Sequence, residues 1–205
     1  MNGQTIGIIC ALSRELGHLY AKPPSNCRIV VGGMGASAAE HAARSIEAEV
    51  LISAGYAGGL AAPAARGAIV VDTATAAFDH ALPQAARGRI ADSQTMIRTP
   101  AERAALAAAT GAIAVDMESA AIARVAKERG IPFLAIRVVT DGPEDTLVID
   151  WDRYRNPDGT IRTTLAVLSA LHSRQGVAEL FWLWYSSKEA TSVLSAYLTR
   201  FLEKL

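Results

Sequence analysis

The stretch Phe133-Leu134-Ala135-Ile136-Arg137-Val138-Val139 decides the fold of this 205-residue chain. Such a largely apolar run is typical of a strand that is covered on both faces of a sheet. A helical pattern precedes it over residues 117–129 and ends at Gly130-Ile131-Pro132, where a glycine and a proline favour termination. The sequence therefore predicts that strands and helices alternate along the chain.

The same alternation extends toward the N-terminus. Helical patterns cover residues 37–49 and 100–109, the second with Thr99 as N-cap and Pro100 at its first position. Further short apolar runs are Ile6–Ala11, Arg28–Val31, Val50–Ser53, Ala68–Val71 and Ala112–Val115. We expect an α/β fold, a single domain over residues 1–205 with a mixed, mostly parallel central sheet flanked by helices. Its core is predicted over residues 5–145. Turn signals at 142–145 and 156–159 then lead into a helical tail over 160–205.

The composition excludes several classes of protein. Hydrophobic residues make up 51 % and charged residues 20 %, which excludes a disordered chain. Twenty basic and twenty acidic residues leave no basic excess, so we expect no nucleic-acid partner. Cys10 and Cys27 lie in no zinc-like cluster and are expected as buried thiols in a reducing cytosol. We see neither a signal peptide at Met1–Thr5 nor a transmembrane segment, and expect a cytoplasmic protein.

Several polar or glycine-rich motifs follow predicted strands, where ligands of open α/β sheets bind. Gly33–Ala38 fits a dinucleotide pattern, but no acid follows the next strand, so a tight turn is favoured over an NAD-binding site. Glu118 stands where a carboxylate could accept hydrogen bonds from a ribose diol; the alternative is an acidic helix N-terminus. Asp141 follows an apolar strand and could serve as a general acid; the alternative is the start of a turn.

Five segments in order together resemble the superfamily of nucleoside phosphorylases and methylthioadenosine/S-adenosylhomocysteine nucleosidases. They are Ile6–Glu15, Gly33–Gly35, Ser53–Leu60, Val115–Ala121 and Arg137–Asp141. Within that superfamily, residues 92–116 and the helical tail are most similar to the hopanoid-associated phosphorylase group. The resemblance implies cleavage of a purine N-glycosidic bond, with release of adenine from an adenosine-type lipid nucleoside.

The resemblance also implies roles for single residues. Asp141 would be the general acid at purine N7, and Glu15 would orient or deprotonate water. The implied substrate contacts are Glu118 on the ribose hydroxyls, Met117 on the sugar, Ala57 and Gly58 along the base, and Met96 in place of a base-stacking aromatic. Candidates for a phosphate site are Arg14, Gly35 and Arg66. No metal or organic cofactor is implied, and inorganic phosphate is the candidate second substrate, so phosphorolysis and hydrolysis both stay open.

Two alternatives to this function remain. One is a soluble methylthioadenosine/S-adenosylhomocysteine-type nucleosidase, and the other is a catalytically silent nucleoside- or lipid-binding protein. In the tail, Phe181–Tyr185 is a cluster of large apolar residues, and apolar residues from Val193 to Leu205 then recur at helical spacing and predict one broad apolar stripe. We favour its packing on the core or in the interface of a homo-oligomer. The alternative is a surface that receives a polycyclic lipid or touches a membrane, where Trp and Tyr are common.

Overall fold

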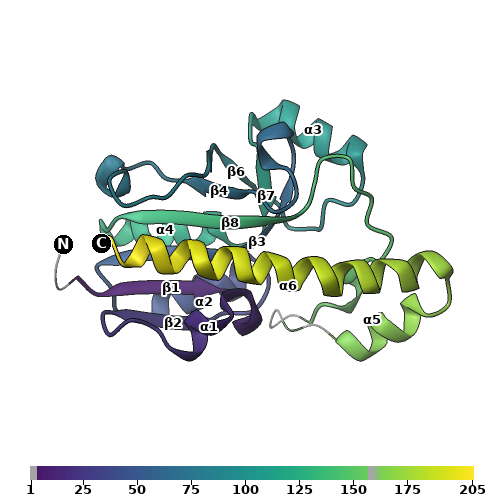
Figure 1. Cartoon of the computed structure of the whole chain (residues 1–205), viewed down its shortest axis with the longest axis horizontal. Coiled ribbons are helices and arrows are strands. Elements are labelled where there is room, and N and C mark those ends of the chain that lie inside the picture. Colours follow the sequence, from purple (N-terminus) through teal and green to yellow (C-terminus); the bar gives the residue numbers. More distant parts are fainter. Residues whose placement is uncertain (1–3, 157–159, 161) are drawn as a thin grey trace.

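A computed structural model of the protein describes residues 4–156, 160 and 162–205. Its described strands form one eight-stranded sheet, in which β2-β1-β3-β8-β4-β5 are neighbours in that order and β7 joins β3 to β6 (Figure 1). Only the β3–β7 and β4–β8 pairs are antiparallel, so the sheet is mixed and mostly parallel, as predicted. The strands are β1 (Ile6–Cys10), β2 (Cys27–Val31), β3 (Val50–Gly59), β4 (Ile69–Asp72), β5 (Ala86–Arg87), β6 (Ile90–Asp92), β7 (Ala114–Asp116) and β8 (Phe133–Asp141).

Helices cover both faces of the sheet, which confirms the expected α/β fold. On one face, α2 (Ala36–Ser45) and α4 (Ser119–Arg129) pack on Ile9 and Leu51. On the other, α6 (Arg174–Leu202) packs on Ile8 and Ile52 (Figure 1). This division follows from the strand period of two, since Ile8 and Ile9 point to opposite faces. The short elements η1 (Ser13–Leu16) and α1 (His18–Ala21) lie beside α6, and α5 (Thr163–Ala170) precedes it.

The capping signals of α3 (Pro100–Thr110) are confirmed. The Thr99 hydroxyl accepts from the Glu102 N–H while the Glu102 carboxylate accepts from the Thr99 N–H, a reciprocal capping box. Gly111 ends the helix with φ +67°, a left-handed conformation that favours glycine. The remaining short helical turns are η2 (Ala62–Ala64), η3 (Ala76–Phe78) and η4 (Trp151–Tyr154).

Some predicted boundaries are wrong. The strand expected at Val50–Ser53 continues to Gly59, because its glycine-rich end pairs with β8. The helix expected over residues 37–49 ends at Ser45, since Ile46 turns to extended backbone and buries its side chain. The helix expected from residue 117 starts at Ser119, and β5 and β6 were missed because they contain only two and three residues. Residues 157–159 of the predicted turn lie outside the described residues.

The tail combines two environments in one helix. The second half of α6 buries Leu194, Tyr197, Leu198 and Phe201 against the sheet, which agrees with the interpretation of its stripe as core. In the first half, Phe181, Trp184 and Tyr185 are exposed, so these three side chains of the preceding cluster do not pack on the core. Across the described part of the chain, no helix is both long and apolar enough to cross a membrane. Cys10 and Cys27 are buried free thiols.

Candidate functional site

Arg137 forms the centre of a buried charged cluster at the ends of several strands. Its Nε donates to Asp116 Oδ2 at 2.6 Å and its Nη2 to Ser53 Oγ at 2.7 Å. A second carboxylate, Glu118, lies 3.8 Å from Nη2. Burial alone would lower the pKa of Arg137, but Asp116, Glu118 and Glu15 together hold it above its usual value. The cluster thus sets one guanidinium among three carboxyl groups.

Gly55 lies where the side chains of Arg137 and Glu15 approach each other. It pairs with Arg137 across β3 and β8. A Cβ at Gly55 would lie 3.0 Å from Arg137 Nη1 and 3.2 Å from both carboxylate oxygens of Glu15. A side chain at this position would therefore collide with both the Arg137 guanidinium and the Glu15 carboxylate. The glycine is explained by this close approach, since its own backbone is ordinary strand.

Glu15 is a buried acid in this cluster, as its expected role requires. It is supplied by η1, and its Oε2 accepts from the Leu12 N–H at 3.0 Å. Burial raises the pKa of Glu15, and the Leu12 N–H and the Arg137 charge oppose that shift only in part. A carboxyl with a raised pKa can exchange a proton with water nearer to neutral pH.

Glu118 stands at the start of α4 with little access to solvent. Its side chain is 13 % exposed, and its Oε1 accepts from the Gly35 N–H at 2.8 Å. Burial, with Asp116 as the second cause, raises the pKa of Glu118 to about 7. Two segments that are 83 residues apart are joined by this one hydrogen bond, so the turn before α2 belongs to the same site.

We expect this raised pKa to appear in the pH dependence of catalysis. The ribose-binding role that the resemblance implies for Glu118 requires its ionised form, so for that role kcat/KM should fall by about tenfold per pH unit below pH about 7. Glu118→Gln removes the titrating group but keeps an oxygen for the Gly35 N–H, and this limb of the profile should disappear. A limb that persists in Glu118→Gln would instead belong to Glu15, and a wild-type profile flat to pH 5 would contradict the prediction.

Asp141 ends β8 beside a register shift. Val139 pairs with Ala57 and Asp141 with Gly58, so Thr140 is an extra residue in β8. Such a bulge re-aims the side chains that follow it. The Asp141 side chain is 11 % exposed; its Oδ1 accepts from the Thr140 hydroxyl at 2.7 Å, and its Oδ2 from Arg103 Nη2 at 2.5 Å.

A cavity of about 290 Å³ opens next to this cluster, at the β2 edge of the sheet. Its lining includes Met117 and Gly35, two of the predicted site residues, and the side chain of Arg155. Arg155 Nη1 lies 3.9 Å from the Met117 sulfur, and its Nη2 donates to Gln94 O at 2.9 Å. The other lining residues are Met34, Ala36, Ser37, Ala38, Gln94 and Asn156.

The remaining predicted residues are more dispersed. Ala57 is buried in β3. Met96 is in the segment before α3, where its N–H donates to Asp152 Oδ2 at 2.6 Å. The phosphate candidates do not form one group: Arg14 is exposed on η1, Gly35 lines the cavity, and Arg66 pairs with Asp145 at 2.9 Å and stacks 4.6 Å from the ring centre of Trp182.

Sequence reasoning did not assign a role to Arg137, Asp116 or Arg103. Arg137 could have been recognised from the sequence, because a charged residue in the middle of an apolar strand must have buried partners. Asp116 was visible only as part of an acidic helix start. Arg103 gave no signal, since it lies among alanines in a helix with no apolar stripe to mark an inner face.

We compared the chain with known proteins. Residues 72–158 match the family model of the Phosphorylase superfamily. This superfamily segment runs from the last residue of β4 through β5–β8, and so includes both Glu118 and Asp141. Glu15 and Gly35 precede it. A search of curated proteins finds no significant match.

Solved structures show the same fold over nearly the whole chain. S-adenosylhomocysteine nucleosidase of Streptococcus pyogenes is 19 % identical, with 100 % of this chain and 98 % of that chain covered and a TM-score of 0.69. The 5′-methylthioadenosine/S-adenosylhomocysteine nucleosidase of Neisseria meningitidis is 17 % identical, with 98 % and 100 % covered and a TM-score of 0.72. A futalosine hydrolase mutant of Helicobacter pylori is 16 % identical, with 98 % and 100 % covered and a TM-score of 0.65. This chain therefore has the nucleosidase fold.

Proposed function

We propose that this protein is an enzyme that cleaves the N-glycosidic bond of a purine nucleoside. The observation that carries the proposal is the joining of Glu15, Glu118 and Arg137 in one buried cluster, with Asp141 four residues beyond Arg137 at the end of β8. The superfamily segment, which spans Glu118 and Asp141, and the nucleosidase fold support it.

The chemistry follows from where charge develops. A purine leaves most easily as a neutral base, so a proton must reach its N7 as the bond breaks. Asp141 takes up this proton from solvent at Oδ1, passes it to N7 and returns to the carboxylate that pairs with Arg103. The ribose then gains oxocarbenium character, and the carboxylate of Glu118 stabilises the cation while it holds the hydroxyls. Met117, which lines the cavity beside Gly35, packs on the sugar.

Strand order sets the direction of the nucleoside. Asp141 ends β8, Glu15 follows β1 and the cavity opens at β2, so the sheet order β2-β1-β3-β8 places the cavity on the far side of the cluster from Asp141. A purine at Asp141 and a ribose at Glu118 leave the 5′ carbon directed to the cavity. We therefore propose the space beside Arg155 for the 5′ substituent.

Water is the acceptor that the described residues favour. Glu15 is a buried acid with a raised pKa inside the cluster, whereas Arg14 is exposed and Arg66 is paired with Asp145. The test is product analysis with purified protein and adenosine or 5′-methylthioadenosine, with and without inorganic phosphate. Free ribose derivative supports hydrolysis, a ribose 1-phosphate derivative supports phosphorolysis, and no purine release from any nucleoside contradicts the proposal.

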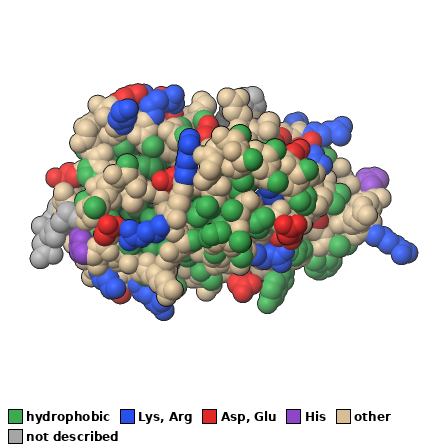
Figure 2. All heavy atoms as spheres, turned by 90° about the horizontal axis from the view of Figure 1, so that it is seen from above, with side chains coloured by type: hydrophobic (Ala, Val, Ile, Leu, Met, Phe, Trp, Pro, Cys, Tyr) green, Lys and Arg blue, Asp and Glu red, His purple; other side chains and the backbone are tan. Residues whose placement is uncertain are grey.

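A lipid nucleoside is the finer substrate that we propose. The observation that favours it is the α5–α6 apolar face, which consists of the exposed side chains Leu165, Leu168, Leu171, Phe181, Trp184 and Tyr185. Figure 2, which views the molecule from above, shows hydrophobic side chains at the lower right of the surface, on the side where α6 runs across the front of Figure 1. This face lies near the cavity. Helix α5 packs against η4, and η4 immediately precedes Arg155, which lines the cavity. An apolar 5′ tail could pass from the cavity onto it.

We expect the double variant Phe181→Ser/Trp184→Ser to lose association with liposomes and turnover of a lipid nucleoside by about tenfold or more, since each large exposed ring that inserts contributes hydrophobic free energy. Cleavage of adenosine should stay within about twofold. Trp182 is left intact, because its ring packs under Arg66 and is half-buried, unlike Trp184. Tyr20→Ser, an exposed aromatic on α1, is the matched control. A variant that changes its oligomeric state without a loss of liposome binding would assign the face to a subunit interface.

A further inference from the structure

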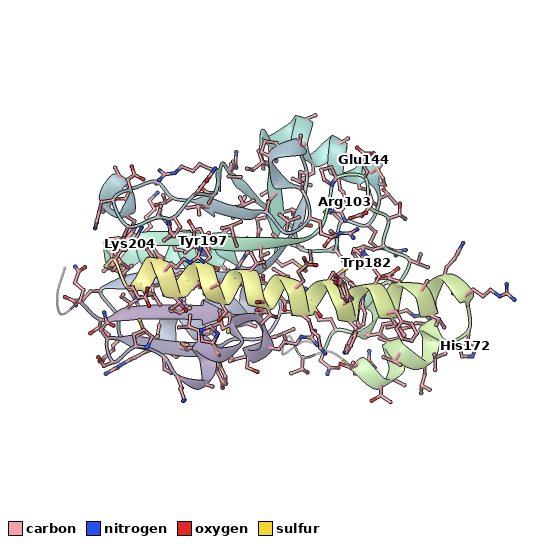
Figure 3. The ribbon with its side chains drawn as sticks, viewed as in Figure 1. Arg103, Glu144, His172, Trp182, Tyr197 and Lys204 are labelled. Atoms are coloured by element: carbon pink, nitrogen blue, oxygen red, sulfur yellow. The ribbon has the colours of Figure 1, made fainter. Side chains whose placement is uncertain are left out.

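Arg103 is enclosed to a degree that is unusual for a charged residue. None of its side chain is exposed, and it is the only buried residue of α3. Figure 3 shows it on the inner side of that helix. Enclosing a guanidinium is unfavourable unless its donors are well paired. The rest of α3 is rich in alanine, so the helix could have packed with an apolar residue here.

The bonds of Arg103 are directed at the candidate site. Nη2 donates to Asp141 Oδ2 at 2.5 Å and to the Ile97 carbonyl at 3.0 Å, and Nη1 donates to the Gly59 carbonyl at 3.2 Å. Nε has no partner, and it is the one buried side-chain nitrogen or oxygen in that position among the described residues. The guanidinium is therefore placed for its contact with Asp141, at the expense of a complete set of hydrogen bonds.

Gly58 shows that the neighbouring strand makes room for this pair. A Cβ at Gly58 would lie 2.8 Å from Arg103 Nη1 and 3.1 Å from Asp141 Oδ2. The first distance is too short for a real contact, so any side chain here would displace the guanidinium. This glycine is thus required by the ion pair, in addition to any contact that its backbone makes with a base.

The two oxygens of Asp141 consequently differ. Oδ2 is held by Arg103, which has no freedom to move away in a closed interior. Oδ1 is held only by the Thr140 hydroxyl, which can rotate toward the Ala57 carbonyl at 3.4 Å. Oδ1 is therefore the oxygen that is available to form a hydrogen bond with a ligand.

We propose that Arg103 is a positioning residue that reserves Oδ2, so that Asp141 reads N7 of the purine but not its substituent at C6. The inference rests on the proposed function. On the edge that carries N7, adenine offers a 6-amino donor and guanine a 6-oxo acceptor. A carboxyl group with two free oxygens could serve N7 and the 6-amino group together. In this proposal Arg103 fixes Oδ2 on the side away from the base, so only Oδ1 serves the base, at N7. The substrate class is then purine nucleosides with either substituent.

The experiment compares kcat/KM for adenosine, inosine and purine riboside, which differ in the C6 region of the base. In the wild-type protein we expect values within about tenfold of one another. Arg103→Met frees Oδ2 and should raise the preference for adenosine over inosine by about tenfold, the usual value of one such hydrogen bond. Arg103→Lys keeps a cation on Oδ2 and should keep the wild-type ratio. Arg89→Met, which alters an exposed arginine bonded to the end of α3, is the control.

Two results would overturn the proposal: a wild-type preference above about 100-fold for either substituent, or an unchanged ratio in folded Arg103→Met. If Arg103→Met fails to fold, the wild-type and Arg103→Lys ratios still decide. Loss of kcat with no change in the C6 ratio would mark a merely structural role. An absence of purine release from every nucleoside would overturn the proposed function itself, whereas strong discrimination by an active enzyme would overturn this inference alone.

Discussion

Asp141→Asn is expected to lower kcat by about 10²-fold or more, because the amide cannot give a proton to N7 and general acid catalysis typically contributes that much. The ion pair with Arg103 means that this variant should also lose stability. Replacing one partner of a buried pair leaves the other charge poorly compensated and costs about 3–5 kcal/mol of stability. Thermal unfolding must therefore be measured beside turnover.

Asp145→Asn is the matched control for this variant. Asp145 lies four residues on, and its carboxylate is held by the Arg66 guanidinium and the Gly142 N–H. Its partly exposed ion pair contributes little, so turnover should stay within about threefold of wild type. If Asp141→Asn, folded and at saturating substrate, turned over as fast as Asp145→Asn, the general acid would have to be sought elsewhere.

Glu118→Ala should produce a loss of similar size, but one that depends on the sugar. A carboxylate that accepts from two ribose hydroxyls makes two charged hydrogen bonds, each about 1.5–3 kcal/mol, so kcat/KM for a ribonucleoside should fall by about 10²-fold or more. For a 2′,3′-dideoxynucleoside the hydroxyl contribution is absent, and the variant should lose much less. The measurement is the ratio of the two losses.

A stability measurement separates this role from a structural one. The pKa of Glu118 is raised to about 7 from the usual 4.5, so ionising it destabilises the folded protein as pH rises through this range. Glu118→Ala removes that penalty and should unfold no earlier than wild type at pH 8. Equal losses on both sugars, together with a lower unfolding temperature at pH 8, would show that Glu118 acts on the fold and not on the ribose.

The sequence predicted the sheet well because its core strands are apolar runs bounded by clear turn residues. It predicted the chemistry of the strand ends only through the order of five segments, since each motif alone also fits an ordinary turn or helix start. The sequence pattern could not show which side chains from distant elements contact each other. Nothing in the local pattern around Arg103 connects it to Asp141, 38 residues later, and nothing around Gly35 connects it to Glu118. The unequal exposure along α6 was equally hidden, because it depends on where the sheet ends beneath the helix.

The cluster around Arg137 has one further consequence. It holds one fixed positive charge against three groups that can each carry a negative one, so at alkaline pH the empty protein maintains a charge imbalance in its interior. This is a cost in stability that the fold tolerates in exchange for activity, a compromise common in active sites. Under the proposed function, the missing positive charge is the one that the sugar would acquire as its bond to the base breaks. The resting protein is thus an unfilled electrostatic complement of that transient cation, and stable cationic mimics of the sugar should find it already organised to receive them.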